Sequence, residues 1–324
     1  MAERVLVTGG AGFIGLHLVR RLLADGAEVT VLDDFSRGRE DSALLEVRDH
    51  VTVVPYDLRR PIDSTHLKGD WDTVYHLAAV VGVARAQQRP AHVLRTNVLT
   101  TVNLLDWCER HPPRTLFLSS TSEVADGAMA LGLSSFPASE TVPFAVPDPH
   151  APRASYALSK VVSEALALHA GKDTRMRIAR YHNVYGARMG HSHVIPQFID
   201  RLQRGENPFR VYGPTQTRSF CHVDDAIDAT VALARLPHAD PRVVNIGNDQ
   251  EEIAAIDLAR LLFDLAGCRP RLELLAPPPG SPQRRLPDLS AARRWLDYRP
   301  RVALVDGLRR TFDWYTENAA GEAR

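Results

Sequence analysis

A tyrosine and a lysine stand four positions apart in the stretch Tyr156-Ala-Leu-Ser-Lys160. Residues at this spacing share one face of a helix, so the phenol and the ammonium are expected to be neighbours. A nearby positive charge lowers the pKa of a tyrosine below its ordinary value of about 10. The resulting phenolate can accept the proton of an alcohol while a hydride leaves the same carbon. The spacing is common on helices, so its meaning depends on what else the chain provides.

Polar side chains that could join this chemistry follow an apolar run that begins at Thr115. They occur in the stretch Ser119-Ser120-Thr121-Ser122-Glu123. The Thr121 hydroxyl could share a hydrogen bond with the reacting oxygen, or it could simply cap a strand or helix end. Ser122 and Glu123 are further candidates because they adjoin it.

A glycine-rich turn, Thr8-Gly9-Gly10-Ala11-Gly12-Phe13-Ile14-Gly15, lies between an apolar run and a stretch of helical periodicity. Glycines allow the sharp turn, the approach of a pyrophosphate to the backbone, and close helix packing. Asp33 ends the next apolar run and could bind the hydroxyls of an adenosine ribose. A carboxylate at that place repels a 2′-phosphate, which favours NAD over NADP, although Arg37 and Arg39 nearby weaken that preference.

Apolar runs alternate with helical periodicity along most of the chain, which predicts an α/β protein with a Rossmann-type, doubly wound parallel sheet. We expect a domain over residues 1–172, a returning segment near 218–247, and a smaller C-terminal lobe over 173–324. The expected strands are 4–8, 28–32, 51–55, 73–77, 115–119 and 175–181, and the expected helices are 13–24, 91–110 and 155–170.

The composition bounds the possible partners. The 39 Lys and Arg balance the 39 Asp and Glu, so nothing calls for nucleic acid or an acidic membrane. The three cysteines show no metal-binding or disulfide pattern, and no apolar run of membrane-spanning length occurs. We therefore expect a cytoplasmic protein without a metal.

Taken in order, these motifs resemble the extended short-chain dehydrogenase/reductase family, in particular its nucleotide-sugar epimerases, dehydratases and decarboxylases. The resemblance also rests on Leu77-Ala-Ala79 and on Tyr181-His-Asn-Val-Tyr-Gly186, and it covers nearly the whole chain. It implies that residues 1–172 bind NAD, that the lobe binds a UDP-sugar, and that helices 91–110 and 155–170 form a homodimer.

The resemblance also implies roles for individual residues. The catalytic candidates are Tyr156, Lys160, Thr121, Ser122 and Glu123. The cofactor candidates are Gly9, Gly12, Phe13, Ile14, Gly15, Asp33, Asp34, Phe35, Ser36, Asp57, Leu58, Leu77, Ala78, Ala79, Asn97, Ser119, Tyr156, Lys160, Tyr181 and Val184. The substrate candidates are Arg85, Thr121, Asn183, Arg188, Val194, Tyr212, Arg218 and Arg285. Of these, Arg218 and Arg285 match arginines that clamp the diphosphate, although either could be ordinary surface charge.

The shared first step of such enzymes is oxidation at C4 of the sugar to a transient 4-keto intermediate. Dehydratases carry an Asp-Glu pair where this chain has Ser122-Glu123, which disfavours dehydration. Thr-Ser-Glu at 121–123 and Pro152-Arg153 resemble the UDP-glucuronate decarboxylases, but Ala125 and Ala187 replace a tyrosine and a proline of that group. Candidates for holding a sugar carboxylate are Arg85, Arg153, Arg188, His191 and His193.

These residues leave several functions open. We favour a UDP-sugar 4-epimerase that converts UDP-glucuronate to UDP-galacturonate, with UDP-glucuronate decarboxylase as the close alternative. UDP-glucose or UDP-N-acetylglucosamine 4-epimerase and a non-catalytic NAD-binding sensor are lesser alternatives, the last because a fold alone does not determine function.

Overall fold

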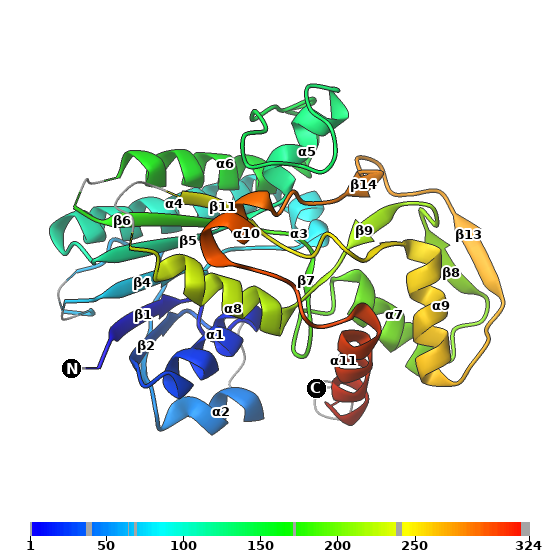
Figure 1. Cartoon of the computed structure of the whole chain (residues 1–324), viewed down its shortest axis with the longest axis horizontal. Helices are drawn as coiled ribbons and strands as arrows, with labels where there is room; N and C mark the ends of the chain where they lie inside the picture. Colours follow the sequence, from blue (N-terminus) through cyan, green and yellow to red (C-terminus); the bar gives the residue numbers. More distant parts are fainter. Residues whose placement is uncertain are drawn as a thin grey trace.

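Seven parallel strands form the central sheet in the computed structural model of the chain (Figure 1), in the order β11-β6-β5-β4-β1-β2-β3. The structure describes residues 2–36, 41–63, 65–67, 70–170, 173–237 and 242–318, so Arg37 and Arg39 lie outside the described residues. The strands are β1 Arg4–Thr8, β2 Glu28–Asp33, β3 Thr52–Pro55, β4 Thr73–His76, β5 Thr115–Thr121, β6 Arg175–Tyr181 and β11 Arg242–Ile246. The predicted doubly wound fold is confirmed.

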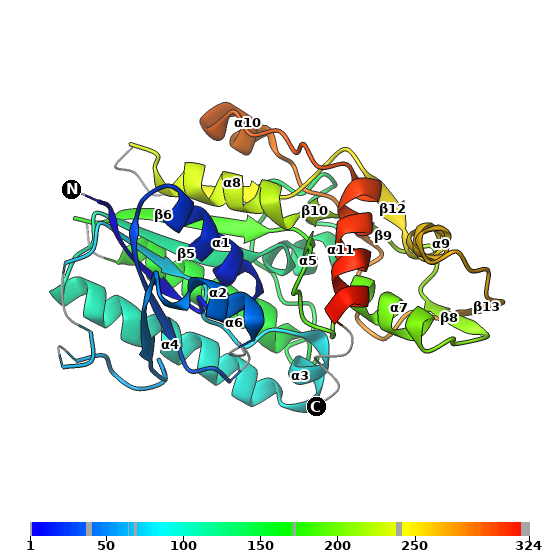
Figure 2. The ribbon, with the colours of Figure 1, turned by 90° about the horizontal axis from the view of Figure 1, so that it is seen from below.

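Helices cover both faces of this sheet, and Figure 2 shows the sheet between α8 and α4. Alternate strand residues divide between the two layers: Val5 and Val7 pack with α1 and α8, whereas Leu6 packs with α4 and α6. Burial on both faces explains why the strands read as continuous apolar runs. The helices around the sheet are α1 Phe13–Ala24, α2 Ser42–Arg48, α3 Val83–Gln88, α4 Pro90–Arg110, α5 Glu123–Ala130, α6 Ala154–His169, α8 Val223–Ala234 and α10 Ser290–Leu296.

A smaller lobe lies beyond the carboxyl ends of the strands and has its own apolar core, which includes Ile195, Phe209 and Leu262. Its helices are α7 Val194–Gln203, α9 Ala255–Ala266 and α11 Leu304–Asn318. Its strands are β7 Val184–Tyr185, β8 Phe209–Tyr212, β9 Thr217–Ser219, β10 Cys221–His222, β12 Glu252–Ala254, β13 Leu272–Leu275 and β14 Arg284–Arg285. They form three small sheets, β10-β7, β12-β9-β14 and β13-β8.

The expected boundary at residue 172 does not separate the sheet from the lobe. β6 begins at Arg175, yet it pairs with β5 and β11 within the central sheet. The sheet therefore continues past residue 172, and its edge strand β11 and the covering helix α8 come from the region expected to return near 218–247.

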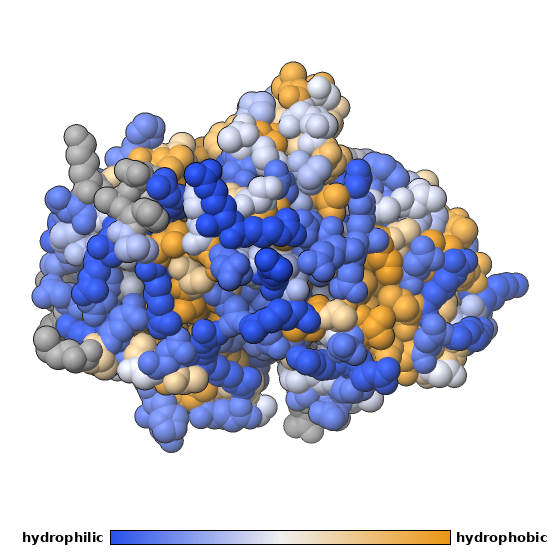
Figure 3. Space-filling view, viewed as in Figure 1, coloured by the Kyte–Doolittle hydropathy of each residue, from blue (hydrophilic) through white to orange (hydrophobic). Residues whose placement is uncertain are grey.

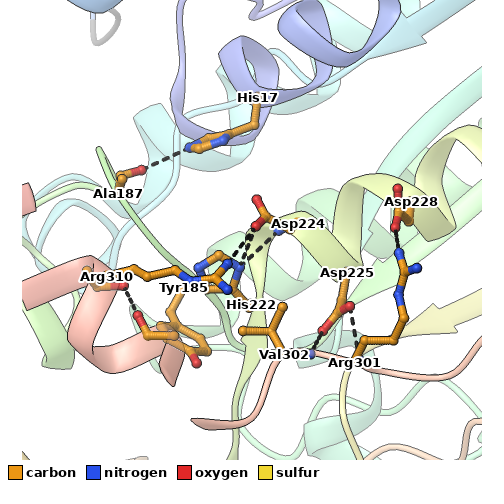
Figure 4. Close-up of polar contacts among 12 residues, drawn as sticks. His17, Tyr185, Ala187, His222, Asp224, Asp225, Asp228, Arg301, Val302 and Arg310 are labelled. Carbon is orange, nitrogen blue, oxygen red and sulfur yellow. Dashed lines mark hydrogen bonds and ion pairs between the residues drawn. The ribbon is translucent and has the colours of Figure 1, made fainter. Parts of the chain in front are cut away.

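Hydrogen bonds between distant segments hold the lobe against the sheet (Figure 4). The Asp225 carboxylate of α8 accepts from the backbone N–H groups of Arg301 and Val302, both at 3.0 Å. His17 of α1 contacts the Ala187 carbonyl at 3.1 Å. These contacts fix the lobe relative to the strand ends, where the candidate residues lie. Among the described residues, no helix is both long and apolar enough to span a membrane.

Candidate functional site

The glycine turn between β1 and α1 is packed so tightly on one side that only glycine fits. Gly9 has φ +73°, and a Cβ there would lie 2.7 Å from the backbone nitrogen of Ala78. A Cβ on Gly15 would lie 2.8 Å from the Gly10 Cα. Gly12 is different: it has an extended backbone and its added Cβ would approach only the Gly9 carbonyl, at 3.1 Å.

The helix that follows this turn begins at Phe13, directly after Gly12. No side chain caps its first turn, so its N–H groups and dipole are aimed at the space above Gly12. A diphosphate is the kind of group that such a helix start binds well. The turn therefore fits the pyrophosphate of a dinucleotide.

Asp33 ties the glycine turn to the loop after β2. One carboxylate oxygen accepts from the Ala11 N–H at 3.0 Å, and the other from the Phe35 N–H at 2.9 Å. Burial raises the pKa of Asp33, and these two N–H groups oppose that rise. Each carboxylate oxygen can accept more than one hydrogen bond, so Asp33 can still bind ribose hydroxyls.

Other cofactor candidates surround this turn and the neighbouring strand ends. The Asp34 carboxylate accepts from Ser36, and Asp57 forms an ion pair with Arg59 at 2.6 Å. The remaining cofactor candidates lie in α1, at strand ends or in the loops after the strands. They are Phe13, Ile14, Leu58, Leu77, Ala78, Ala79, Ser119 and Val184.

Lys160 is buried on α6, and its ammonium donates to the Ser119 carbonyl of β5 at 2.8 Å. Burial lowers the pKa of this ammonium to about 8, and the Glu164 carboxylate one turn further along opposes the decrease. Tyr156, one turn earlier, is half-buried. The contact with Ser119 places this part of α6 beside the end of β5, as expected.

Two cofactor candidates use their polar groups to support the site. The Asn97 side chain bonds both the N–H and the carbonyl of Val80, at 2.7 and 3.0 Å, and donates to Ser159 at 3.0 Å. It thus joins the loop after β4 to α6. The Tyr181 hydroxyl is buried against Thr230 of α8 at 2.6 Å. Both contacts are with protein groups far away in the sequence.

The end of β5 leads directly into the candidate residues of α5. The Thr121 hydroxyl accepts from the Glu123 N–H at 3.3 Å, and the Ser122 N–H donates to the Tyr181 carbonyl at 3.0 Å. The Glu123 carboxylate lies 3.4 Å from the Arg285 guanidinium of β14. Glu123 thus connects the strand end with one of the two candidate arginines.

Arg218 and Arg285 are direct neighbours in the pairing of β9 with β14. Arg218 donates to the carbonyls of Thr217 and Pro282, at 2.7 and 2.6 Å. Burial lowers the pKa of Arg218 to about 10, and the charge of Arg285 contributes to the decrease. Asn183 adjoins them, since its amide donates to the Ser219 carbonyl at 3.0 Å.

A cavity of about 500 Å³ opens in the lobe and brings Val194, Tyr212 and Arg218 together. Phe198, Gln216 and Phe220 also line it. Its lining combines apolar and aromatic side chains with three arginines, Arg201, Arg210 and Arg218, which suits a flat base joined to a phosphate group. Three substrate candidates that are far from Tyr156 in the sequence therefore share one pocket.

The five candidates for a sugar carboxylate are dispersed. Arg188 donates to the Ala11 and Gly12 carbonyls, at 2.8 and 3.0 Å, and pairs with Asp41, so it supports the glycine turn. Arg85 is exposed on α3, His191 packs on Tyr315, and His193 precedes α7. Arg153, which directly precedes α6, carries a charge that helps to lower the pKa of Arg218.

The structure also reveals polar residues that sequence reasoning did not select. Asp126, three positions after Glu123 on α5, bonds the Arg285 guanidinium from two oxygens. His182 is buried, donates from Nε2 to the Asn245 amide oxygen at 3.1 Å, and has a ring nitrogen, Nδ1, without a hydrogen-bond partner. The spacing of Glu123 and Asp126 was a usable signal, since such residues share a helix face. His182 had no comparable signal.

Comparisons with known proteins agree with this arrangement. Residues 5–247 match the sequence model of the NAD dependent epimerase/dehydratase family. UDP-glucuronic acid decarboxylase 1 of Xenopus tropicalis is 34% identical over 99% of this chain and 74% of that protein. UDP-N-acetyl-alpha-D-glucosaminuronate decarboxylase of Bacillus cytotoxicus is 30% identical over 98% of this chain and 99% of that protein.

A solved structure is similar over the same length. UDP-glucuronic acid 4-epimerase from Bacillus cereus, in complex with UDP-glucuronic acid and NAD, has a TM-score of 0.85 and 29% identity, and covers 97% of this chain and 99% of its own. The chain therefore belongs to the NAD-dependent epimerase/dehydratase family, and its cofactor is NAD.

Proposed function

We propose that this protein decarboxylates UDP-glucuronate to a UDP-pentose. The observation that carries the proposal is the contact of Glu123 with Arg285, 3.4 Å apart, next to Thr121 at the end of β5. A decarboxylase must place a proton on the carbon that loses CO2, so it needs an acid at that point. A 4-epimerase has no such requirement, and Glu123 would have no chemical task in it.

The first step is oxidation at C4 of the sugar. Tyr156 takes the proton of the C4 hydroxyl, Thr121 holds the same oxygen by a hydrogen bond, and the Lys160 ammonium favours the phenolate. NAD, held by the glycine turn and Asp33, would supply the acceptor for the C4 hydride and the source of the hydride that restores C4. The product of this step is a 4-keto uronate.

The second step breaks the bond between C5 and the carboxylate. The 4-keto uronate is a β-keto acid, so the electron pair of that bond moves into an enolate and CO2 leaves. C5 then takes up one proton, which we assign to Glu123. Return of the proton from Tyr156 to O4, with the hydride, gives the UDP-pentose.

The lobe would hold the rest of the substrate. We assign the cavity of about 500 Å³ to the uracil and ribose, with Val194 and Tyr212 at the base. Arg218 at the same cavity would bind the diphosphate, because a guanidinium can donate two hydrogen bonds to phosphate oxygens. Arg218 pairs with Arg285, which contacts Glu123, so the sugar would lie near the end of β5.

The sequence motifs favoured a 4-epimerase, whereas the names of the relatives favour a decarboxylase. Both curated relatives described above are named as decarboxylases of UDP-uronates. The same substrate enters the 4-epimerase of the similar solved structure, which keeps UDP-glucuronate 4-epimerisation as the second candidate. An epimerase would have to retain the carboxylate of the same keto intermediate.

Product analysis separates the two candidates. Purified protein is incubated with UDP-glucuronate and the products are identified by proton NMR, with trapped CO2 measured in parallel. The proposal predicts a UDP-pentose and equimolar CO2. UDP-galacturonate without CO2 would instead establish the epimerase. The variant Tyr156→Phe serves as the inactive control, since it removes the proton acceptor and should leave bound NAD in place.

A further inference from the structure

The guanidinium of Arg285 faces two carboxylates at once. Its Nε donates to Asp126 at 3.1 Å, its Nη2 donates to the second oxygen of Asp126, and the same Nη2 lies 3.4 Å from Glu123. The three side chains are 10% exposed for Arg285, 15% for Glu123 and 27% for Asp126. Asp126 therefore makes the closer contact, through two nitrogens of the guanidinium. Glu123 contacts only one of these nitrogens, Nη2, at the longer distance.

The backbones on both sides of this cluster are held in place. α5 presents Glu123 and Asp126 on one face, and a side chain at Gly127 would collide with the Ala145 carbonyl, so the helix sits directly against the following segment. On the other side, Ala138 accepts from the Asp288 N–H at 2.9 Å and donates to the Leu286 carbonyl at 2.8 Å. The geometry of the cluster is thus set by its side chains, not by mobile backbone.

The charges of the cluster argue against binding of the substrate diphosphate by Arg285. Two carboxylates and one guanidinium carry a net charge of about −1 if all three are ionised, which repels a diphosphate. Arg218, in contrast, bonds only backbone carbonyls, and it lines the cavity of the lobe whereas Arg285 does not. Of the two arginines, Arg218 is the better phosphate ligand, and Arg285 is committed to the carboxylates.

We propose that Asp126 is a positioning residue of this site: it engages Arg285 and thereby determines where Arg285 meets Glu123 and how much of its charge Glu123 experiences. The inference rests on the proposed function, because it concerns the acid that protonates C5. A guanidinium bound to Glu123 alone could turn all of its donors toward that carboxylate. The two-point contact with Asp126 instead leaves only one nitrogen of Arg285 near Glu123.

Few other groups near the cluster change charge in the working range of pH. Arg218 on β9 and Arg153 before α6 keep their charge, since arginine is protonated at all ordinary pH values. His182, which follows β6, is kept neutral because burial lowers its pKa to about 4. Within the cluster, Arg285 therefore divides its contacts between the Glu123 and Asp126 carboxylates.

The test compares Asp126→Asn with wild type and with a matched control. Asp257→Asn on α9 also removes a carboxylate paired with an arginine, Arg260 at 2.9 Å, but far from the strand ends. We expect Asp126→Asn to lower kcat for UDP-glucuronate decarboxylation about ten- to a hundredfold. The KM should change less than about twofold, because Asp126 does not bind the substrate.

The separation of kcat from KM, together with its rescue, gives the decisive signature. With Asp126→Asn, kcat should fall while KM stays nearly constant, because Arg285 loses the contact that places it beside Glu123. Asp126→Glu keeps the carboxylate and should restore kcat in part, which separates this role from a folding defect. Thermal unfolding of each variant confirms that the fold is intact.

The outcomes distinguish the inference from the proposed function. If wild type releases no CO2 from UDP-glucuronate, the proposed function fails. If wild type decarboxylates and Asp126→Asn matches it in kcat and KM, the positioning role is refuted. A lower KM with unchanged kcat would also overturn it, since Arg285 would then be released to bind the diphosphate.

Discussion

The charge of the Lys160 ammonium depends on one neighbouring carboxylate, that of Glu164. It is buried and donates to the Ser119 carbonyl. The nearby negative charge is Glu164, which is fully buried and pairs with Arg180 at 2.8 Å. Glu164 also accepts from the Ser120 hydroxyl, so it joins α6 to the end of β5. The same carboxylate thus supports both the position and the charge of Lys160.

Replacing Glu164 by glutamine should move the alkaline limit of catalysis. The ordinary pKa of a lysine, 10.5, is lowered by burial to about 8, and the Glu164 charge raises it. Without that charge the pKa of Lys160 falls further, so the ammonium that favours the Tyr156 phenolate is lost at lower pH. We therefore predict that the high-pH loss of kcat begins at lower pH in Glu164→Gln, measured by a pH profile against wild type.

The control for this prediction is Glu46→Gln on α2. This change also removes a carboxylate that pairs with an arginine, Arg20 of α1, but the pair is exposed. It should leave the profile unchanged. Glu164→Gln should also cost about 3 kcal/mol of unfolding free energy, because it leaves Arg180 buried without its partner. A pH profile identical to wild type would contradict the role of Glu164.

At the residue scale, the sequence predicted local relations far better than distant ones. Tyr156 with Lys160, and the glycines with one another, act through neighbours a few positions away, so motif spacing was informative. Asn97 and Tyr181 were interpreted as cofactor residues, yet their polar groups bond Ser159 and Thr230. Those partners are 62 and 49 positions away, and no spacing rule identifies such pairs.

At the element scale, the strands and helices that carry the site follow the apolar pattern closely. The structure places β1 at the predicted residues 4–8 and α1 at 13–24. The predicted 91–110 helix begins one residue earlier, at Pro90, and 155–170 is shifted by one residue. The short strands β7, β10 and β14 have two residues each, too few for any period to be visible. Of these, β14 pairs with β9 and brings Arg285 to Arg218, so that pairing could not be predicted.

The glycine turn yields a prediction that separates folding from binding. Gly15→Ala places a methyl group against the Gly9 and Gly10 backbone and should destabilise the fold by about 1–3 kcal/mol. Gly12→Ala fits the extended backbone and should cost less than about 1 kcal/mol, yet its methyl group would enter the space that we propose for the pyrophosphate. NAD content should fall at least about tenfold in Gly12→Ala, since a phosphate would lose its backbone contacts.

The measurements are thermal unfolding and the NAD content of each purified variant. Full NAD content in Gly12→Ala would show that the pyrophosphate does not approach this turn. Unchanged stability in Gly15→Ala would show that the packing of α1 on the turn is looser than these distances indicate.

At the scale of the whole molecule, two surfaces expose apolar side chains to solvent. α4 and α6 pack side by side on the sheet, and Val162 and Leu168 of α6 are 37% and 38% exposed. Figure 3 shows further hydrophobic residues on the projection formed by α5 and the segment after it, where Leu131, Leu133 and Phe144 are exposed. The first surface is the one that the sequence analysis expected in a homodimer.

We propose a homodimer in which α4 and α6 of one protomer pack on those of its partner, as two-fold symmetry allows. Light scattering after size exclusion should give twice the chain mass for wild type and the chain mass for Val162→Glu. Val305→Glu, an equally apolar exposed position on α11, is the control and should stay dimeric. A monomeric wild type, or a dimeric Val162→Glu, would contradict this interface.

The most direct test of the account follows the C5 proton. UDP-glucuronate is converted by the protein in deuterium oxide, and the product is analysed by NMR and mass spectrometry. Decarboxylation with protonation by Glu123 predicts a UDP-pentose that carries one solvent deuteron at C5. A UDP-hexuronate with its carboxylate intact and no deuterium at C5 would contradict the account and identify the protein as a 4-epimerase.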